Sequence, residues 1–173
     1  MMRQPWIERR FGFDLSPSLL PNVIERLRGM PARLQERLTD RSAEVLTRRV
    51  GASWSIQENV GHLVEVEPLF LGRMDDYDAG LAILRAADME NRKTQDADYN
   101  SRDLGGILRE FRSRRAELVA RLEPLNEAEA ARVAHHPRLD RPMRVVDLAI
   151  FAAEHDDHHL ARITELLRLL GLE

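Results

Sequence analysis

The sequence has no cysteine among its 173 residues, and Lys93 is the only lysine among 26 basic residues. Without cysteine, disulfide bonds and thiolate chemistry from the chain's own side chains are excluded. A metal site in this protein would have to use histidine, aspartate or glutamate. The scarcity of lysine is typical of a GC-rich bacterial genome and says little about function.

Long apolar runs are also absent. No segment approaches the roughly 18 apolar residues of a membrane span, and residues 1–20 carry scattered charges, unlike a signal peptide. We therefore expect a cytoplasmic protein with no membrane partner. The formal net charge of −3 argues against nucleic-acid binding. The arginine-rich run at residues 109–115 is predicted to be a solvated helix face.

The composition, with 43% apolar and 32% charged residues, is that of a globular protein. No internal repeat, low-complexity segment or linker divides the chain. At this length the chain can bury a core of its own. We expect residues 1–173 to form a single domain.

Apolar residues recur at helical spacing in four stretches, near residues 21–40, 55–76, 101–122 and 144–170. The first is interrupted by Gly29 and Pro31, which predict two pieces or a kink. Sustained period-2 alternation is absent, so strands are not expected, and residues 135–142 are predicted to be a loop. Four helices with long connections predict an all-α, four-helix bundle.

Several residues predict where these helices begin and end. Ser55 and Glu58 match a capping box at the start of the second helix, and Pro68 lies inside that helix. Asn100 or Ser101 is the expected N-cap of the third helix. Gly171 is the expected stop signal of the fourth helix.

Three of the six histidines fall within residues 155–159, inside the fourth predicted helix. His155 and His159 are four residues apart, so they share one face with Cβ atoms roughly 5–6 Å apart. Two imidazole nitrogens at that spacing can reach one metal ion at about 2.0–2.1 Å each. His62, in the second helix, is the candidate third ligand, with its nitrogen within about 4 Å of the others.

Other interpretations of the histidines remain open. His158 falls with Glu154 on a more polar side of the helix, yet His155 could pair with His158 instead. The histidines could also be buried core residues that each find a separate hydrogen-bond partner. His135 and His136 are interpreted as turn residues.

Carboxylates near the histidines could orient the imidazoles or transfer protons. Glu67 falls on the inward side of the second helix, where an unpaired carboxylate is costly, so we expect it to pair with Arg73 or another arginine. Glu154 and Asp157 flank the histidine pair and could accept a hydrogen bond from an imidazole or stay in solvent. Glu67, Glu154 and Asp157 are the candidate catalytic residues.

Two segments resemble the DinB/YfiT-like superfamily of metalloenzymes. These are residues 54–63 (WSIQENVGHL) and residues 153–163 (AEHDDHHLARI), and residues 10–14 (RFGFD) and 136–139 (HPRL) resemble a subgroup. One histidine early in the second helix and His-x-x-x-His in the fourth form the motif of that family. The resemblance implies a four-helix bundle, often a homodimer, that binds zinc, nickel or a similar divalent ion through His62, His155 and His159.

The family resemblance also bears on activity. Some members are transferases that use a low-molecular-weight thiol such as bacillithiol or mycothiol, and others look hydrolytic. The leading hypothesis is therefore a metal-dependent enzyme, a thiol S-transferase or a hydrolase, acting on a small molecule. The alternatives are a non-catalytic metal-binding stress-response module and a purely structural helical interaction protein. Apolar residues near the N-terminus, including Trp6, Phe11 and Phe13, add to the expectation of a dimer.

Overall fold

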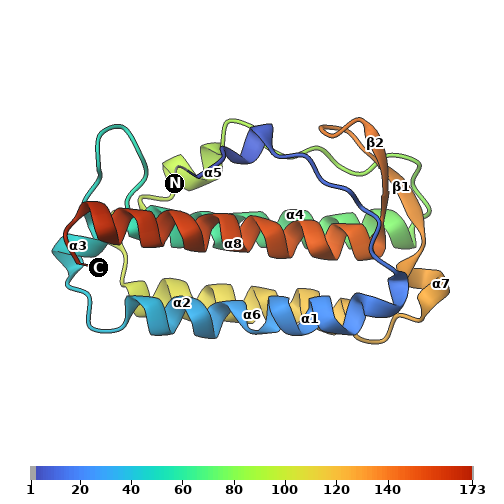
Figure 1. Cartoon of the computed structure of the whole chain (residues 1–173), viewed down its shortest axis with the longest axis horizontal. Helices are drawn as coiled ribbons and strands as arrows, with labels where there is room; N and C mark the ends of the chain where they lie inside the picture. Colours follow the sequence, from blue (N-terminus) through green and yellow to red (C-terminus); the bar gives the residue numbers. More distant parts are fainter. Residues whose placement is uncertain (1–2, 173) are drawn as a thin grey trace.

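The computed structural model describes residues 3–172 and consists of long helices in two layers (Figure 1). Helices α4 (Ile56–Asp78) and α8 (Val145–Leu169) form one layer. Helix α6 (Leu104–Leu122) and the consecutive helices α1 (Leu20–Arg28) and α2 (Met30–Leu38) form the other. The predicted all-α, four-helix bundle is confirmed, and the first helix is divided at Gly29 as expected.

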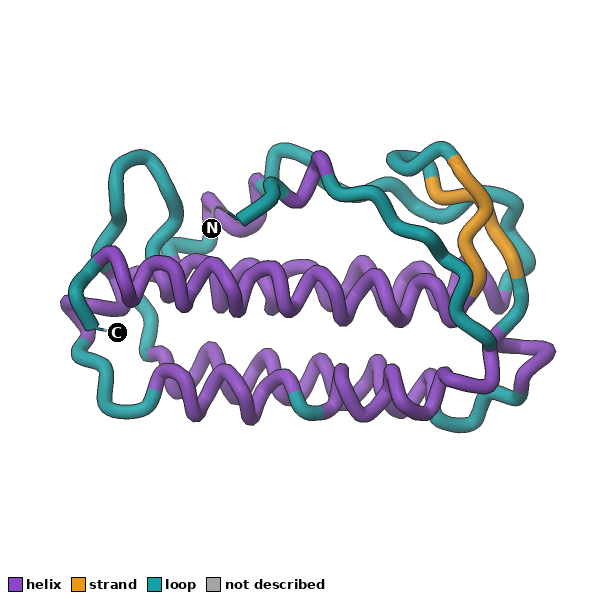
Figure 2. The backbone as a smooth tube through the Cα atoms, in the orientation of Figure 1, coloured by secondary structure: helices purple, strands orange, loops and turns teal. Residues whose placement is uncertain are grey.

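The shorter elements lie between and beside these helices. They are η1 (Trp6–Glu8), η2 (Pro17–Leu19), α3 (Ala43–Thr47), α5 (Arg92–Asp96), η3 (Tyr99–Ser101), α7 (Glu127–Ala130), β1 (Val133–His136) and β2 (Arg141–Arg144). Figure 2 shows that the N-terminal segment, the loop around α5 and the β1–β2 hairpin run along the outer side of the α4–α8 layer. No helix between residues 3 and 172 has both the length and the apolar character needed to cross a membrane.

The β1–β2 hairpin corrects the loop predicted for residues 135–142. Its strands pair antiparallel, with Ala134 opposite Met143 and His136 opposite Arg141. The buried positions alternate along β1, but they hold alanine and histidine, so no apolar alternation marks the strand in the sequence. The hairpin is also held from outside, because the His135 N–H donates to the carbonyl of Ala82 at 2.8 Å.

The predicted helix ends are mostly confirmed. Ser55 and Glu58 form the reciprocal capping box at the start of α4, and Gly171 follows α8 with a φ of 76°. The predicted cap of α6 was wrong. Asp103 is the N-cap, because its carboxylate accepts from Gly106 N–H at 2.7 Å, whereas Asn100 and Ser101 belong to η3.

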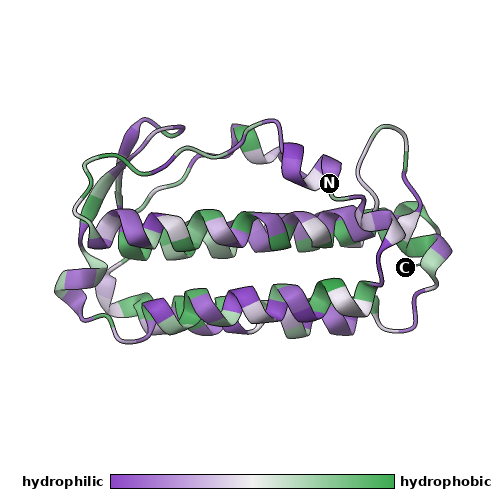
Figure 3. Ribbon diagram, turned by 180° about the vertical axis from the view of Figure 1, so that it is seen from behind, coloured by the Kyte–Doolittle hydropathy of each residue, from purple (hydrophilic) through white to green (hydrophobic). Residues whose placement is uncertain are grey.

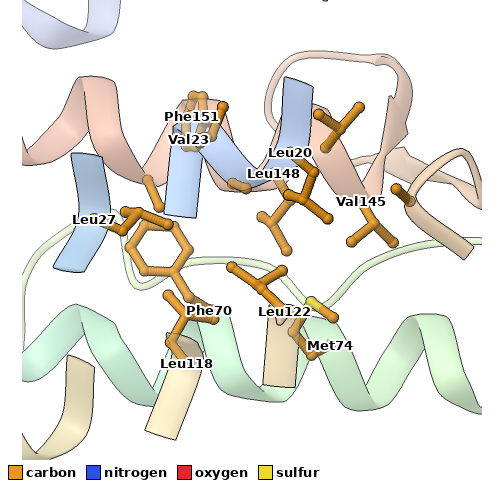
Figure 4. Packing of buried hydrophobic residues seen from close by; sticks show 14 of the residues in the cluster. Leu20, Val23, Leu27, Phe70, Met74, Leu118, Leu122, Val145, Leu148 and Phe151 are labelled. Carbon is orange, nitrogen blue, oxygen red and sulfur yellow. The ribbon is translucent and has the colours of Figure 1, made fainter. Parts of the chain in front are cut away.

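The buried apolar side chains form two clusters along the bundle, and Figures 3 and 4 show the apolar helix faces and part of the first cluster. On α4 the division falls between Val64 and Phe70, and on α6 between Phe111 and Leu118. A layer of buried charges occupies this gap. Its members are Glu67 of α4, Arg115 of α6 and Asp156 of α8.

Arg115 joins the three helices and reaches a fourth. It donates hydrogen bonds to the carboxylates of both Glu67 and Asp156, and all three side chains are at most 1% exposed. Its Nη1 also donates to the carbonyl of Leu27 at 3.3 Å. Pro31 lies four residues after Leu27 and has no N–H, so this carbonyl lacks its usual helical donor. Glu67 therefore pairs with an arginine, as expected, but with Arg115 and not Arg73.

The neighbouring Arg114 has a similar role at the second proline. Pro68 lies inside α4 and removes the N–H that would bond to the carbonyl of Val64. Arg114 Nη1 donates to that carbonyl at 3.3 Å. The prediction that residues 109–115 form a solvated face was therefore wrong for Arg115, which is 1% exposed, whereas the side chain of Arg114 is 31% exposed. Each proline leaves one backbone carbonyl without its helical donor, and each of these arginines donates to one such carbonyl on a helix distant in the sequence.

Candidate metal centre

Three buried histidines meet between α4 and α8. His62 comes from α4, and His155 and His159 come from consecutive turns of α8. One ring nitrogen from each lies within 4.8 Å of the other two, slightly wider than the expected 4 Å. The Nε2 atoms of His62 and His155 are 3.3 Å apart. Each side chain is only 6–7% exposed.

Two neutral side chains orient the imidazoles. Asn59 donates from its amide nitrogen to the carbonyl of Ser55 at 2.7 Å, so its oxygen faces His159 Nδ1, 2.9 Å away. His159 must therefore carry its proton on Nδ1, which leaves the Nε2 lone pair free. The hydroxyl of Thr94 similarly lies 3.0 Å from His62 Nδ1. Such contacts commonly fix the tautomer of ligating histidines.

The donor set fits a divalent ion of tetrahedral preference. Two ligands at about 2.0–2.1 Å from such an ion stand roughly 3.3–3.4 Å apart, close to the observed separation of the His62 and His155 nitrogens. Burial lowers the pKa of His62 to about 4 and places the pKa values of His155 and His159 well below the ordinary value. All three rings are therefore neutral at physiological pH, the form that binds metals.

His158 does not belong to the group of converging nitrogens, although its ring packs edge-on against that of His159 at 5.4 Å and lines the cavity described below. Its ring lies beside Trp6, with centroids 5.5 Å apart, and beside the guanidinium of Arg3. Trp6 also packs edge-on against His155 at 5.0 Å, so the N-terminal segment covers the histidines from outside. Phe11 and Phe13 stack beside it and are only partly exposed.

The three carboxylates suggested as catalytic lie elsewhere. Glu67 is buried in the charged layer inside the bundle. Glu154 pairs with Arg9 and Arg26. Burial acts to raise the pKa of Glu154, but the two arginines together outweigh it, so the pKa lies below its ordinary value. Asp157 also pairs with Arg26. None of the three lines the cavity described next. The ion pairs of Glu154 and Asp157 connect α8 to α1 and to the N-terminal segment, whereas that of Glu67 connects α4 to α6.

A cavity of about 600 Å³ opens beside the histidines on the outer side of the α4–α8 layer. Its walls include aromatic side chains of Trp6, Trp54, Phe70 and Phe151, and its volume suits a small organic molecule. His62, His155 and His159 all lie in the wall. The histidine cluster is therefore accessible from one side and not enclosed by protein.

Several residues of this site were not identified from the sequence. Glu65 lines the cavity one turn after His62, and its carboxylate accepts from the Tyr99 hydroxyl at 2.6 Å. Its position at i+3 from His62 was a usable signal. Asn59 precedes His62 by three residues and could have been found in the same way. Thr94 could not, because only the fold brings α5 to α4.

The comparisons with known proteins agree with the fold. The structure of YfiT from Bacillus subtilis, described as a probable metal-dependent hydrolase with an unusual four-helix bundle topology, matches with a TM-score of 0.82. The two sequences are 22% identical, and the match covers 96% of this chain and 95% of the other. No curated protein matches the chain. The family model of the DinB superfamily matches residues 26–163, so the chain belongs to the DinB superfamily.

Proposed function

We propose that this protein, as one domain, is a metal-dependent enzyme that binds zinc or nickel through His62, His155 and His159. The observation that carries the proposal is the position of the three neutral imidazoles in the wall of an open cavity. Catalytic metal sites keep three protein ligands and one open position, whereas structural sites are usually saturated by four. Within residues 3–172 the donor cluster holds three residues and no fourth.

The chemistry follows from the groups around the cluster. A divalent ion held there supplies Lewis-acid activation of a water or thiol nucleophile. Glu65 is our candidate for accepting the proton of that nucleophile, because it lines the cavity and, within residues 3–172, only one of its oxygens accepts a hydrogen bond, from Tyr99. Trp54, whose ring centroid lies 4.9 Å from that of His62, shields one side of the cluster from water.

The reaction type is either hydrolysis or thiol transfer. The description of the Bacillus subtilis neighbour favours a hydrolase, whereas the family resemblance includes thiol S-transferases. Because the chain has no cysteine, any thiol nucleophile must come from a second substrate. The test is to assay zinc-loaded and nickel-loaded protein with p-nitrophenyl acetate, and with 1-chloro-2,4-dinitrobenzene plus bacillithiol or mycothiol. Turnover that disappears in metal-free protein supports the proposal.

A non-catalytic metal-binding module is the alternative. It would bind metal with the same three histidines but show no turnover with either substrate type. The open cavity of about 600 Å³ favours the enzyme, because a purely structural ion has no need of such a space.

The Thr94 hydroxyl gives a first mutational prediction. Thr94→Val keeps the shape of the side chain but removes the oxygen that lies 3.0 Å from His62 Nδ1. Because loss of such a contact typically costs 10–100-fold in metal affinity, we expect a drop of about that size. Thr94→Ser, which keeps the hydroxyl, should bind zinc nearly as well as the unmodified protein. Competition titration with a chromophoric chelator measures both, and equal affinities in the two variants would contradict the assigned role.

The oligomeric state and location remain predictions. We expect a homodimer, and the exposed apolar side chains of Ile7, Leu169 and Leu172 near the chain ends are consistent with one. Light scattering at micromolar concentration should then give about twice the 19.9 kDa of one chain. A cytoplasmic location is likewise our proposal.

A further inference from the structure

A second group of polar side chains lines the cavity away from the histidine cluster. Arg73 of α4, His136 of β1 and Arg138 of the hairpin turn all contribute to the wall. Arg73 and His136 are each 1% exposed. Between residues 3 and 172, no carboxylate forms an ion pair with Arg73 or Arg138.

His136 presents a hydrogen-bond donor. Its Nδ1 accepts from the backbone N–H of Leu139 at 3.2 Å, so the ring proton must be on Nε2 in the neutral ring. That Nε2 is buried and has no partner among the described residues. Burial, assisted by Arg73 and Arg138, lowers the pKa of His136 to about 4, so the ring is neutral at physiological pH.

Neither arginine has an ion-pair partner among residues 3–172. Arg73 donates from Nε to the carbonyl of Arg85 at 3.2 Å, and Arg138 Nη2 is buried without a partner. The nearby carboxylate of Asp76 is paired with Arg85. It accepts hydrogen bonds from the Arg85 backbone N–H at 2.8 Å and from the Arg85 guanidinium. Burial lowers the pKa of Arg73 to about 10 and also lowers that of Arg138.

A buried cation without a counter-ion is costly, and proteins usually compensate it with an opposite charge. His136 Nε2 and Arg138 Nη2 are donors without a partner among the described residues, and the buried Arg73 beside them forms no ion pair there. Such a group suits an oxyanion, because guanidinium groups bind carboxylates and phosphates through charged hydrogen bonds. The remaining charged groups of the wall are Glu65, Arg85, Asp88 and Lys93, and Arg85 is paired with Asp76. Glu65 lies eight residues before Arg73 on α4, about 12 Å along the helix.

Apolar surface connects this donor group to the histidines. The ring of Phe151 lies 5.4 Å from that of His136, and the Arg138 guanidinium carbon lies 5.6 Å from its centroid. Phe151 precedes His155 by one turn of α8, and the ring of Phe70 is 6.3 Å from that of His155. On α4, Arg73 lies eleven residues after His62, about three helical turns or 16 Å. The two polar groups are therefore about one to three helical turns apart, with aromatic rings between them.

We propose that the cavity takes a small amphiphilic organic anion, whose carboxylate or phosphate is bound by Arg73, His136 and Arg138 and whose apolar body lies along Phe70 and Phe151. The opposite end of the molecule then lies at the histidine cluster. This last part rests on the proposed enzymatic function, whereas the anion site does not. The inference names the substrate class: an anionic molecule with a reactive group about one to three helical turns from its charge.

Isothermal titration calorimetry on the full-length, metal-free protein tests the anion site without any contribution from a bound ion. The probes are 4-phenylbutyrate, 3-phenylpropyl phosphate and the neutral 4-phenylbutyramide, which matches the first in shape. We expect at least tenfold weaker binding of the amide, because it cannot use the charged hydrogen bonds. The two anions distinguish carboxylate from phosphate recognition. Equal binding of all three probes, or no binding of either anion, would overturn the proposal.

A variant identifies the residues. Arg138→Gln should weaken the preferred anion about tenfold and leave the amide unchanged. Arg109→Gln removes the same charge from a side chain that is 78% exposed on α6, and it should have no effect. Equal losses in both variants would show a general charge effect and contradict the assignment. If anions bind as expected but no metal binds, the anion site stands and the proposed enzyme fails. If metal binds as expected but 4-phenylbutyrate and 4-phenylbutyramide bind equally well, only the anion site fails.

Discussion

His155→Ala or His159→Ala is expected to abolish stoichiometric metal binding, whereas His158→Ala should retain it. His155 and His159 are buried and project with His62 into one cluster. Removing one of three ligands should cost more than the 10–100-fold that is typical when a supporting contact is lost. The measurement is zinc and nickel content by mass spectrometry after loading and gel filtration.

His158→Ala is the matched control for this experiment. It removes a third imidazole from the same segment of α8. The ring of His158 lies beside Arg3 and Trp6 and edge-on to that of His159 at 5.4 Å, but it does not belong to the group of converging ring nitrogens. Circular dichroism of each variant should show that the helices are intact. Equal metal loss in all three variants would mean that the ligand pair was assigned to the wrong face of α8.

Arg115→Met is expected to destabilise the protein by about 3–5 kcal/mol, the usual cost of leaving a buried charge without its partner. The substitution leaves the carboxylates of Glu67 and Asp156 facing each other without their cation. It also leaves the Leu27 carbonyl without the donor that replaces the missing N–H of Pro31. Urea unfolding, followed by circular dichroism, measures the free energy of unfolding.

Arg112→Met is the control on the same helix. Its side chain is exposed and, among the described residues, donates only to Gln35, so its replacement should change the free energy of unfolding by no more than about 0.5 kcal/mol. A triple variant, Glu67→Leu, Arg115→Met, Asp156→Leu, should recover most of the loss, because apolar residues can often replace a buried ionic group. Unchanged stability of Arg115→Met would contradict the charged layer as we describe it.

The histidine cluster could be predicted because its information is local. Spacing alone places His155 and His159 on one face of a helix, and two such helices in a bundle can face each other. The same logic gave the capping box at Ser55 and the break at Gly29. These features depend on residues within a few positions of one another in one helix, so they could be predicted from the sequence.

The partners that come from distant segments could not be predicted. Arg115 was predicted to lie on the surface, because nothing in residues 109–115 indicates that the fold places Glu67 and the first turn of α2, with Pro31, next to it. Thr94 reaches His62 from a short helix that periodicity barely marks. The hairpin that carries His136 and Arg138 has buried alanine and histidine positions, so it lacks the alternation that identifies strands.

Zinc-edge X-ray absorption spectroscopy of the zinc-loaded, full-length protein tests the central claim most directly, because it counts and identifies the ligands of the ion itself. We predict one zinc per chain with three imidazole nitrogens at about 2.0–2.1 Å and one additional light atom from outside the protein. Failure to bind zinc stoichiometrically, or a first shell made only of oxygen atoms, would contradict the assignment of His62, His155 and His159 as a metal centre.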